Sequence, residues 1–272
     1  MPARARGRFD RMVQLLSQIE PLPSDGYEAW GLPRIAFTAE FISAYAKPGC
    51  RVLDLASGSV FSLLLSDALR GVTWIPTDGE FAQSRFNCGK TGELVYDYQP
   101  IPLKIEPKNI NIPNVKQEIV TLFEVVEHFP WNPGPLFGGI SESLAVGGRF
   151  ILSTPNVCGR TSILRQLRGG SPFQSPFFEE GWWFHKKEYA PWELKQLLEW
   201  AGFSVENLTT FNVYREQKGW DAGVHQAALC LAAILSFSPV ELRHVLLHFG
   251  STQFLVARKS GPVKWDVAPP SV

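Results

Sequence analysis

The sequence has no excess of charge of either sign. Its 272 residues include 26 lysines and arginines and 26 aspartates and glutamates, so the formal net charge is zero. Proteins that bind nucleic acid without sequence preference rely on a broad positive surface, which a neutral chain does not provide. We therefore expect no nucleic-acid partner.

Cysteines are few and widely separated. The four of them, Cys50, Cys88, Cys158 and Cys230, form no C-x-x-C pair. Structural zinc sites use closely spaced cysteines and disulfide frameworks use many, so the sequence indicates neither. We interpret the cysteines as reduced thiols of a cytoplasmic protein.

The sequence also lacks a long apolar run. The basic N-terminus is followed by a mixed polar and apolar stretch, which is not typical of a signal peptide. The most apolar later segment, residues 227–237, has about half the length that a membrane-spanning helix needs. We expect no transmembrane segment and interpret residues 227–237 as a packed helix, with an interfacial anchor as the alternative.

The residues that are present are sufficient for a large core. Hydrophobic residues make up 45% of the chain and charged residues 19%, which is typical of a folded globular protein. Short apolar runs alternate with segments of helical spacing, and this alternation favours a parallel sheet that is buried on both faces. The expected strands include residues 51–55, 72–75, 119–123, 149–153, 204–210 and 252–259, with a turn at Gly147 and Gly148.

Several motifs occur along this pattern in a fixed order. Residues 52–59 read VLDLASGS, and Asp78 follows Asp54 by 24 positions. Further on come QEIVTLFEVVEHF at residues 117–129, LAVGGRFILSTPN at 144–156 and HKKEYAPWELKQLLEWAGF at 185–203. Between about Cys50 and Lys259, the order and spacing of these motifs resemble the class I S-adenosylmethionine-dependent methyltransferases.

The resemblance implies a fold, a cofactor and an activity. The fold is a Rossmann-like α/β sheet, mostly parallel with an antiparallel last strand, with helices on both faces and helical insertions. The cofactor is S-adenosyl-L-methionine, and the activity is methyl transfer. We predict a single domain over residues 1–272, in which residues 1–46 are an N-terminal helical extension. It continues with a cofactor-binding half (47–156), a lid insertion (157–188), a C-terminal half with a helical insert (189–260) and a fraying tail (261–272).

The resemblance also assigns cofactor-binding residues. They are Asp54, Ala56, Ser57, Gly58, Asp78, Asn109 and Phe123. The Asp78 carboxylate would accept hydrogen bonds from both ribose hydroxyls, although an aspartate in a D-G turn at the surface is the alternative. Asn109 shares the role of adenine contact with Glu106 as the other possibility.

The turn departs from the family pattern at its outer positions. The family usually has three glycines there, whereas Ala56 and Val60 stand at the outer two places and Gly58 at the middle one. If residue 56 needs a positive φ, alanine costs about 1 kcal/mol and its methyl group could crowd a ligand. A catalytically silent binding module is therefore an alternative to an enzyme.

The candidate catalytic residues are Glu124, Glu127 and His128, which follow the strand at 119–123. Methyl transfer requires a positioned acceptor and removal of its proton, and a histidine can act as general base near neutral pH. The alternative is that the Glu-His pair only borders the site. We expect O-methylation of a small-molecule acceptor, a saccharide or a secondary metabolite; a homo-oligomer is possible.

A metal-dependent alternative rests on the same residues. The pattern E124-x-x-E127-H128, together with His185, resembles the magnesium site of small-RNA 2′-O-methyltransferases. Carboxylates suit a hard cation, and a metal would position and acidify a hydroxyl acceptor. Because the neutral chain lacks an obvious RNA surface, we predict that no metal is required.

The long connection between residues 157 and 184 completes the predictions. It carries three arginines, Arg160, Arg165 and Arg168, before a cluster of aromatic residues from Phe173 to Phe184. A connection of this length is commonly functional, so we predict a mobile cover over the acceptor site. The alternative is a small local core beneath a long loop.

Overall fold

The computed structural model describes residues 27–57, 59–78, 83–87, 93–97, 99–100, 112, 116–171, 185–211 and 250–271. Several predictions fall outside these residues: Gly58, Asn109, the aromatic part of the lid and the apolar segment 227–237. Of Asp78, the backbone is described and the side chain is not. None of the helices within the described ranges is long and apolar enough to span a membrane.

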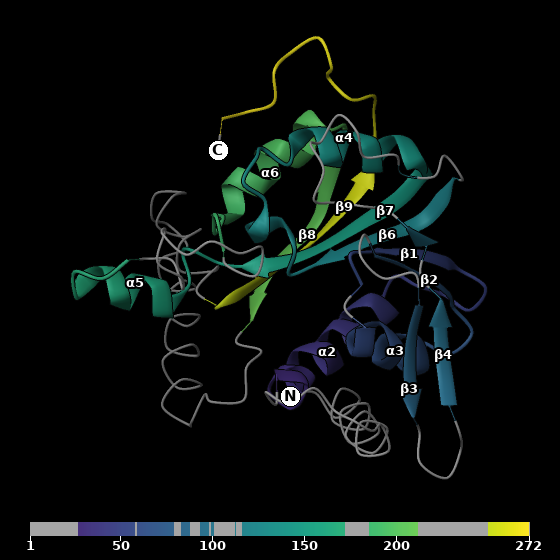
Figure 1. Ribbon diagram of the computed structural model, residues 1–272. Coiled ribbons are helices and arrows are strands. Elements are labelled where there is room, and N and C mark those ends of the chain that lie inside the picture. Colours follow the sequence, from purple (N-terminus) through teal and green to yellow (C-terminus); the bar gives the residue numbers. More distant parts are fainter. Residues whose placement is uncertain are drawn as a thin grey trace. The chain divides into compact units, whose positions relative to one another are not determined.

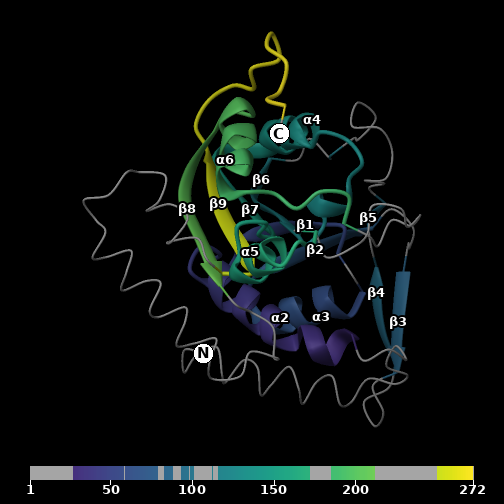
Figure 2. The same cartoon turned by 90° about the vertical axis from the view of Figure 1, so that its left-hand side faces the viewer.

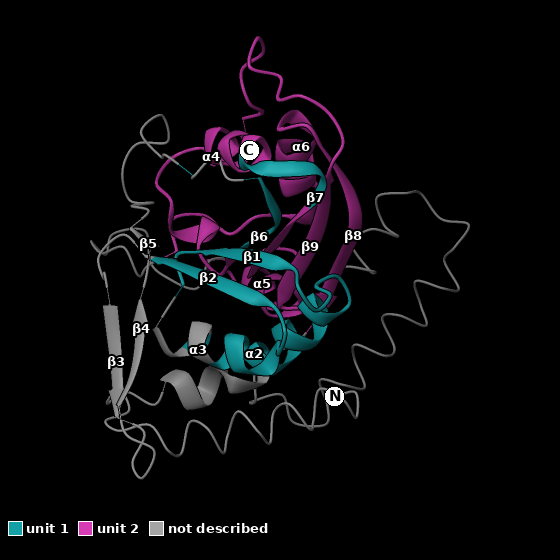
Figure 3. Ribbon diagram, turned by 90° about the vertical axis from the view of Figure 1, so that its right-hand side faces the viewer, with its two compact units in different colours: residues 1–121, 143–148, 213–215 teal, residues 122–142, 149–212, 216–272 magenta. Residues whose placement is uncertain are grey.

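The chain divides into two compact units, which Figure 3 colours separately. The first contains residues 1–121, 143–148 and 213–215, and the second contains residues 122–142, 149–212 and 216–272. Within the described ranges, the main sheet has seven strands in the order β5-β2-β1-β6-β7-β9-β8. Strands β6 (Gln117–Phe123) and β7 (Leu144–Pro155) each have residues in both units.

The first unit contains the parallel strands of the N-terminal part. Strand β1 (Arg51–Leu55) pairs in parallel with β2 (Thr73–Asp78), which pairs in parallel with β5 (Gln99–Pro100). Helix α2 (Tyr27–Ser43) packs against α3 (Ser59–Ala68) (Figure 1). Helix α2 buries Ile35, Ala36, Ala39 and Ile42, whose spacing matches one face of a helix.

A second, two-stranded sheet lies in the first unit and was not predicted from the sequence. Strands β3 (Gln83–Asn87) and β4 (Glu93–Asp97) pair antiparallel. Their short segments mix polar and apolar residues without the continuous apolar run that marks β1. Composition alone therefore gave no clear strand signal there.

The second unit contains the antiparallel edge of the main sheet. Strand β9 (Thr252–Lys259) pairs antiparallel with both β7 and β8 (Phe203–Phe211), and Figure 2 shows β8 and β9 side by side. The same unit contains the 3-10 helix η3 (Val126–His128) and helices α4 (Gly134–Ser143), α5 (Arg160–Leu167) and α6 (Pro191–Trp200). The prediction of an antiparallel last strand is confirmed.

A chain of aromatic contacts forms part of the core of the second unit. The rings of Phe137 and Phe150 lie 5.3 Å apart, and those of Phe150 and Phe203 lie 5.8 Å apart. Each of these residues is at most 3% exposed. Helix α4, β7 and the start of β8 are joined through this stack, which fixes the elements that carry the residues described below.

Two details of the sequence prediction are wrong. The segment at Gly147 and Gly148 was expected to form a turn, but β7 runs through it and Gly147 takes a positive φ of 77°. A Cβ on Gly148 would lie 2.9 Å from the Ala145 carbonyl oxygen. The glycines therefore permit local backbone conformation and close approach within the strand rather than ending it.

The C-terminal segment was expected to fray, and this is the second error. Trp265 Nε1 donates to Glu142 Oε1 at 2.8 Å, and the Trp265 ring crosses that of Trp200 at 5.3 Å. Trp200 Nε1 in turn donates to the Val267 carbonyl oxygen at 2.8 Å. The two hydrogen bonds donated by the tryptophans attach the segment to α4 and α6. The proline-containing composition of the segment did not indicate these contacts.

Candidate functional site

The turn after β1 contains a strained backbone position. Among the described residues, only Ala56 and Glu124 have a positive φ without being glycine, at 53° and 54°. Each directly follows a strand, Ala56 after β1 and Glu124 after β6. An L-residue in the left-handed region costs free energy, and such positions concentrate at ligand-binding sites. Alanine in place of glycine at position 56 therefore lowers the stability of the folded protein locally.

A buried carboxylate holds this turn in place. Asp54 is 4% exposed, and its Oδ1 accepts a hydrogen bond from Thr121 Oγ1 at 2.6 Å. Its Oδ2 accepts one from Ser57 Oγ at 2.7 Å. The Ser57 backbone N–H donates to the Thr77 carbonyl oxygen at 2.8 Å, which ties the turn to β2. Asp54 and Ser57 thus shape the turn through contacts within the protein.

Contacts within the first unit also show how β1, β2 and residues 117–121 of β6 run. The Arg51 N–H donates to Glu118 Oε2 at 3.0 Å, and three residues further along each strand Asp54 meets Thr121. Equal steps in the same direction mean that β1 and β6 run parallel, and β2 is parallel to β1. The turn therefore lies at the edge where open α/β sheets bind ligands.

Replacing Ala56 with glycine should stabilise the protein. Glycine adopts a φ of 53° without the steric cost of a Cβ, so we expect the free energy of unfolding to rise by up to about 1 kcal/mol. Urea unfolding measures the change. Ala44→Gly, at an exposed position after α2 outside the left-handed region, is the matched control and should lower stability. A loss of stability in Ala56→Gly as well would contradict the strain.

The segment after β6 contains the predicted catalytic residues. The Glu124 backbone N–H donates to the Ser153 carbonyl oxygen at 2.9 Å, and its Oε1 accepts a hydrogen bond from Ser153 Oγ at 2.7 Å. Strand β7 thus fixes both the backbone and the carboxylate of Glu124. Ser153 was not predicted, because nothing local in the sequence connects it to Glu124.

Glu127 is a buried carboxyl group. Its side chain is 1% exposed, and its Oε2 accepts a hydrogen bond from Thr154 Oγ1 at 2.8 Å. Its Oε1 is also buried and accepts no hydrogen bond from any residue in the described ranges. Burial, with a further contribution from the charge of Glu124, raises the pKa of Glu127 to about 8, although His185 acts in the opposite direction. A buried oxygen without a hydrogen bond costs free energy, and a water molecule or a ligand group at this position would supply the missing partner.

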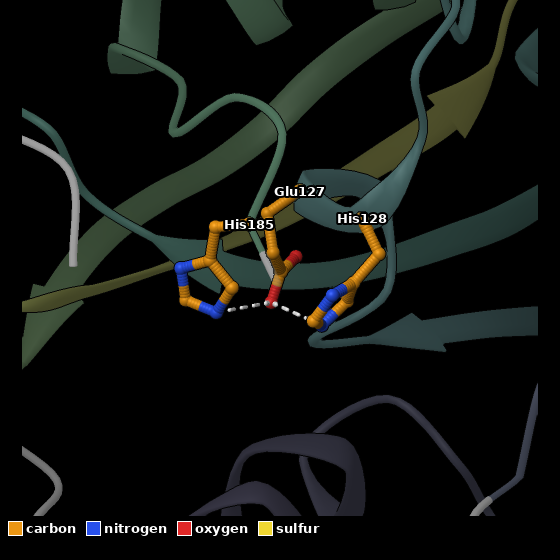
Figure 4. Close-up of side chains that lie close together, drawn as sticks. All are labelled: Glu127, His128 and His185. Atoms are coloured by element: carbon orange, nitrogen blue, oxygen red, sulfur yellow. Dashed lines mark ion pairs between the residues drawn. The ribbon is translucent and has the colours of Figure 1, made fainter. Parts of the chain in front are cut away.

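Two imidazole rings approach this oxygen. His128 Nε2 lies 3.8 Å and His185 Nε2 lies 4.0 Å from Glu127 Oε1, and Figure 4 shows both rings directed toward it. The rings themselves are 5.0 Å apart and nearly perpendicular. These separations exceed hydrogen-bond length, so the three atoms surround a position at which another group could contact them. We call Glu127, His128 and His185 the Glu-His cluster.

The second nitrogen of His185 is held by another carboxylate. His185 Nδ1 lies 3.0 Å from Oε1 of Glu188, whose side chain is 1% exposed. Burial alone would lower the pKa of His185, but the hydrogen bond to Glu188 and the nearby glutamates raise it above its ordinary value. Glu188 is a residue that the sequence analysis missed. The H185-x-x-E188 spacing was the available signal.

The Glu-His cluster has atoms of the right type for a metal ion. Its three ligand atoms lie within 4.8 Å of one another. A metal that binds each atom at about 2.1 Å allows ligand atoms up to about 4.2 Å apart, which includes the two distances to Glu127 Oε1. Two imidazoles and one carboxylate suit transition metals better than magnesium. Glu124, the fourth residue of the predicted set, is instead hydrogen-bonded to Ser153.

The structure thus groups the predicted residues in two sets. In the first unit, Asp54, Ala56 and Ser57 form one turn, whereas the contacts of Asp78 and Gly58 are not described. In the second unit, Glu124, Glu127 and His128 form another set, with half-buried Phe123 as the last residue of β6. The residues that sequence reasoning did not include are Thr77, Thr121, Ser153, Thr154 and Glu188.

The pH dependence of stability should report the burial of Glu127. In the unfolded chain its carboxyl group loses its proton near 4.5, whereas in the folded protein it keeps the proton up to about 8. The folded state binds more protons in between, so this contribution to stability is lost as pH rises through that interval. Glu127→Gln stays neutral, and its stability relative to wild type should therefore increase with pH.

Urea unfolding at pH values below and above the interval measures this difference. Glu199→Gln makes the same chemical change at an exposed position on α6 and is the matched control. A difference between Glu127→Gln and the wild type that does not change with pH would mean that the pKa of Glu127 is not raised in the folded protein.

Comparison with solved structures identifies the fold. A SAM-dependent methyltransferase from Archaeoglobus fulgidus superimposes with a TM-score of 0.51 and 17% identity, over 87% of this chain and 100% of that one. A chain from the complex between the Haloferax volcanii Trm112 methyltransferase activator and a methyltransferase gives a TM-score of 0.52 and 15% identity. Here 87% of this chain and 95% of the other are covered. No protein-family model and no curated protein matches the sequence.

Proposed function

We propose that this chain, which has the fold of the class I SAM-dependent methyltransferases, transfers a methyl group from S-adenosylmethionine to a hydroxyl group of a small molecule. The acceptor class proposed is a saccharide or a secondary metabolite. The observation that carries the choice of a hydroxyl is the convergence of two imidazole nitrogens on the unsatisfied Oε1 of Glu127. Such a set of acceptor atoms suits a group that donates a hydrogen bond and then loses its proton.

Cofactor binding is assigned to the turn of the first unit. S-adenosylmethionine is the cofactor expected for this fold. The left-handed backbone at Ala56 lets main-chain groups face a ligand, and the Asp54 hydrogen bonds keep the turn fixed before binding. Asp78 is proposed to bind the ribose hydroxyls, because it ends β2 at the same edge of the sheet. Gly58, Asn109 and Phe123 complete the proposed set.

The Glu-His cluster is assigned to the acceptor. The sulfonium of the cofactor supplies an already activated methyl group, so the protein has to position the acceptor and take up its proton. A carboxyl group with a pKa of about 8 can hold or release a proton near neutral pH, which is the requirement for a general base. His128 and His185 share the position next to it, and Glu124 adds negative charge nearby.

Calorimetry with S-adenosylhomocysteine tests the cofactor assignment. We expect binding by the wild type, and Asp78→Ala should weaken it by about tenfold or more, as the loss of a charged hydrogen-bonding group implies. Equal affinity of the two proteins would remove Asp78 from the site. No binding by the wild type would favour the silent binding module. Binding without formation of S-adenosylhomocysteine over a panel of sugars and phenols would point the same way.

A metal-assisted 2′-O-methyltransferase that acts on RNA is the second candidate. The observation in its favour is the spacing of the three ligand atoms in the Glu-His cluster. Chelation distinguishes the two, because our proposal expects turnover to survive it. Loss of turnover on chelation and its recovery with Mg²⁺ or Mn²⁺ would replace the proposal with this candidate.

A cytoplasmic location is also proposed, supported by Cys50 and Cys158 being free thiols.

A further inference from the structure

His185 lies between two buried carboxylates that contact different nitrogens of its ring. Its Nδ1 is 3.0 Å from Glu188 Oε1, and its Nε2 is 4.0 Å from Glu127 Oε1. Both carboxylates are 1% exposed, so water screens neither of them strongly. The contact with Glu188 is a hydrogen bond, whereas the contact with Glu127 leaves room for another group.

The segment that carries His185 and Glu188 is anchored on both sides. The backbone N–H groups of Lys186 and Lys187 donate to the Glu127 carbonyl oxygen at 2.6 and 3.1 Å. Further along, the Tyr189 carbonyl oxygen accepts a hydrogen bond from Gln253 Nε2 at 2.7 Å. These contacts attach the segment to η3 at one end and to β9 at the other. The backbone on both sides of His185 is therefore held by hydrogen bonds, which limits the orientations of its ring.

The orientation of His185 decides which of its two ring nitrogens carries the proton. A neutral ring carries its proton on one nitrogen, and the hydrogen bond made by that nitrogen decides which one it is. A carboxylate oxygen can only accept, so Glu188 requires the proton to be on Nδ1. Nε2 then keeps its lone pair, which faces the position next to Glu127 Oε1.

We infer that Glu188 is a positioning residue, which fixes His185 so that its Nε2 presents a lone pair to the hydroxyl of the methyl acceptor. The single hydroxyl hydrogen then lies between His185 Nε2 and Glu127 Oε1, and Glu127 takes up the proton during methyl transfer. The inference rests on the proposed function, since it names the group that orients the acceptor oxygen. Without Glu188, the ring could place its proton on Nε2 and present a donor where an acceptor is needed. The half-buried ring of His185 would then offer no lone pair to the acceptor hydroxyl.

Nitrogen-15 NMR of histidine-labelled protein tests the orientation directly. The chain has five histidines, and the variant His185→Phe identifies the signals of residue 185. At a pH high enough to leave the ring neutral, the wild type should show Nδ1 protonated and Nε2 unprotonated. Glu188→Gln, whose amide can also donate, should populate the form with the proton on Nε2. A wild-type ring protonated on Nε2 would by itself overturn the inference.

Activity provides the second measurement. With an acceptor that the wild type methylates, Glu188→Gln should lower kcat by about 10- to 100-fold, the range typical of carboxylates that orient metal-bound histidines. Its affinity for S-adenosylhomocysteine and its melting temperature should stay close to those of Glu199→Gln, the matched control on α6. Unchanged kcat with an altered proton position would also overturn the inference. If the wild type methylates nothing, the proposed function fails, whereas the NMR result still decides the orientation.

Discussion

Replacement of Glu127 by glutamine is expected to lower methyl transfer by about 100-fold or more, the range over which a general base contributes to catalysis. Glutamine has nearly the same shape and can keep the hydrogen bond from Thr154, but it cannot take up a proton. Formation of S-adenosylhomocysteine with an active acceptor measures the loss. Affinity for S-adenosylhomocysteine should not change, because Glu127 is not among the assigned cofactor residues.

Glu199→Gln is the control for this experiment, since it makes the same chemical change at an exposed position on α6. Its turnover should equal that of the wild type. If Glu127→Gln kept full turnover, Glu127 would serve only the packing around η3, and the proton would have to leave through another group. A parallel loss of cofactor affinity would instead indicate that the substitution disturbs the fold.

Replacement of Asp54 by alanine is expected to cost about 3 kcal/mol of stability, because two buried hydroxyl groups lose a charged acceptor. Those groups belong to Ser57 and Thr121, at 2.7 and 2.6 Å from the carboxylate. The turn should also lose its fixed shape, so we expect weaker binding of S-adenosylhomocysteine by the folded variant. Urea unfolding and calorimetry measure the two effects.

Thr121→Val separates the contributions of the two hydrogen bonds. It removes only the contact with Oδ1 and leaves Ser57 bound to Oδ2, so its effect on stability should be smaller than that of Asp54→Ala. Equal stability of Asp54→Ala and the wild type would show that the two hydrogen bonds to the carboxylate do not stabilise the folded protein. That result would leave the Ser57–Thr77 backbone hydrogen bond as the contact that supports the strained φ of Ala56.

The sequence by itself determined the elements that depend on local pattern. The apolar runs at β1 and β6 predicted buried strands, because residues that leave water on both faces of a sheet must be apolar along the whole strand. The motif order predicted the methyltransferase fold, which the solved structures confirm. Glu124, Glu127 and His128 were found because they are close together in the chain. The hairpin β3–β4 was missed because its residues carry no strong period.

Only the tertiary structure decided how the side chains of both sites are held. Thr121 lies 67 residues from Asp54, and Ser153 lies 29 residues from Glu124, so no spacing rule connects either pair. His185 and Glu127 are 58 positions apart in the sequence. They meet because the backbone N–H groups of Lys186 and Lys187 donate to the Glu127 carbonyl oxygen. Hydrogen bonds and burial depend on which atoms meet in space, and a linear pattern records only which residues can take part.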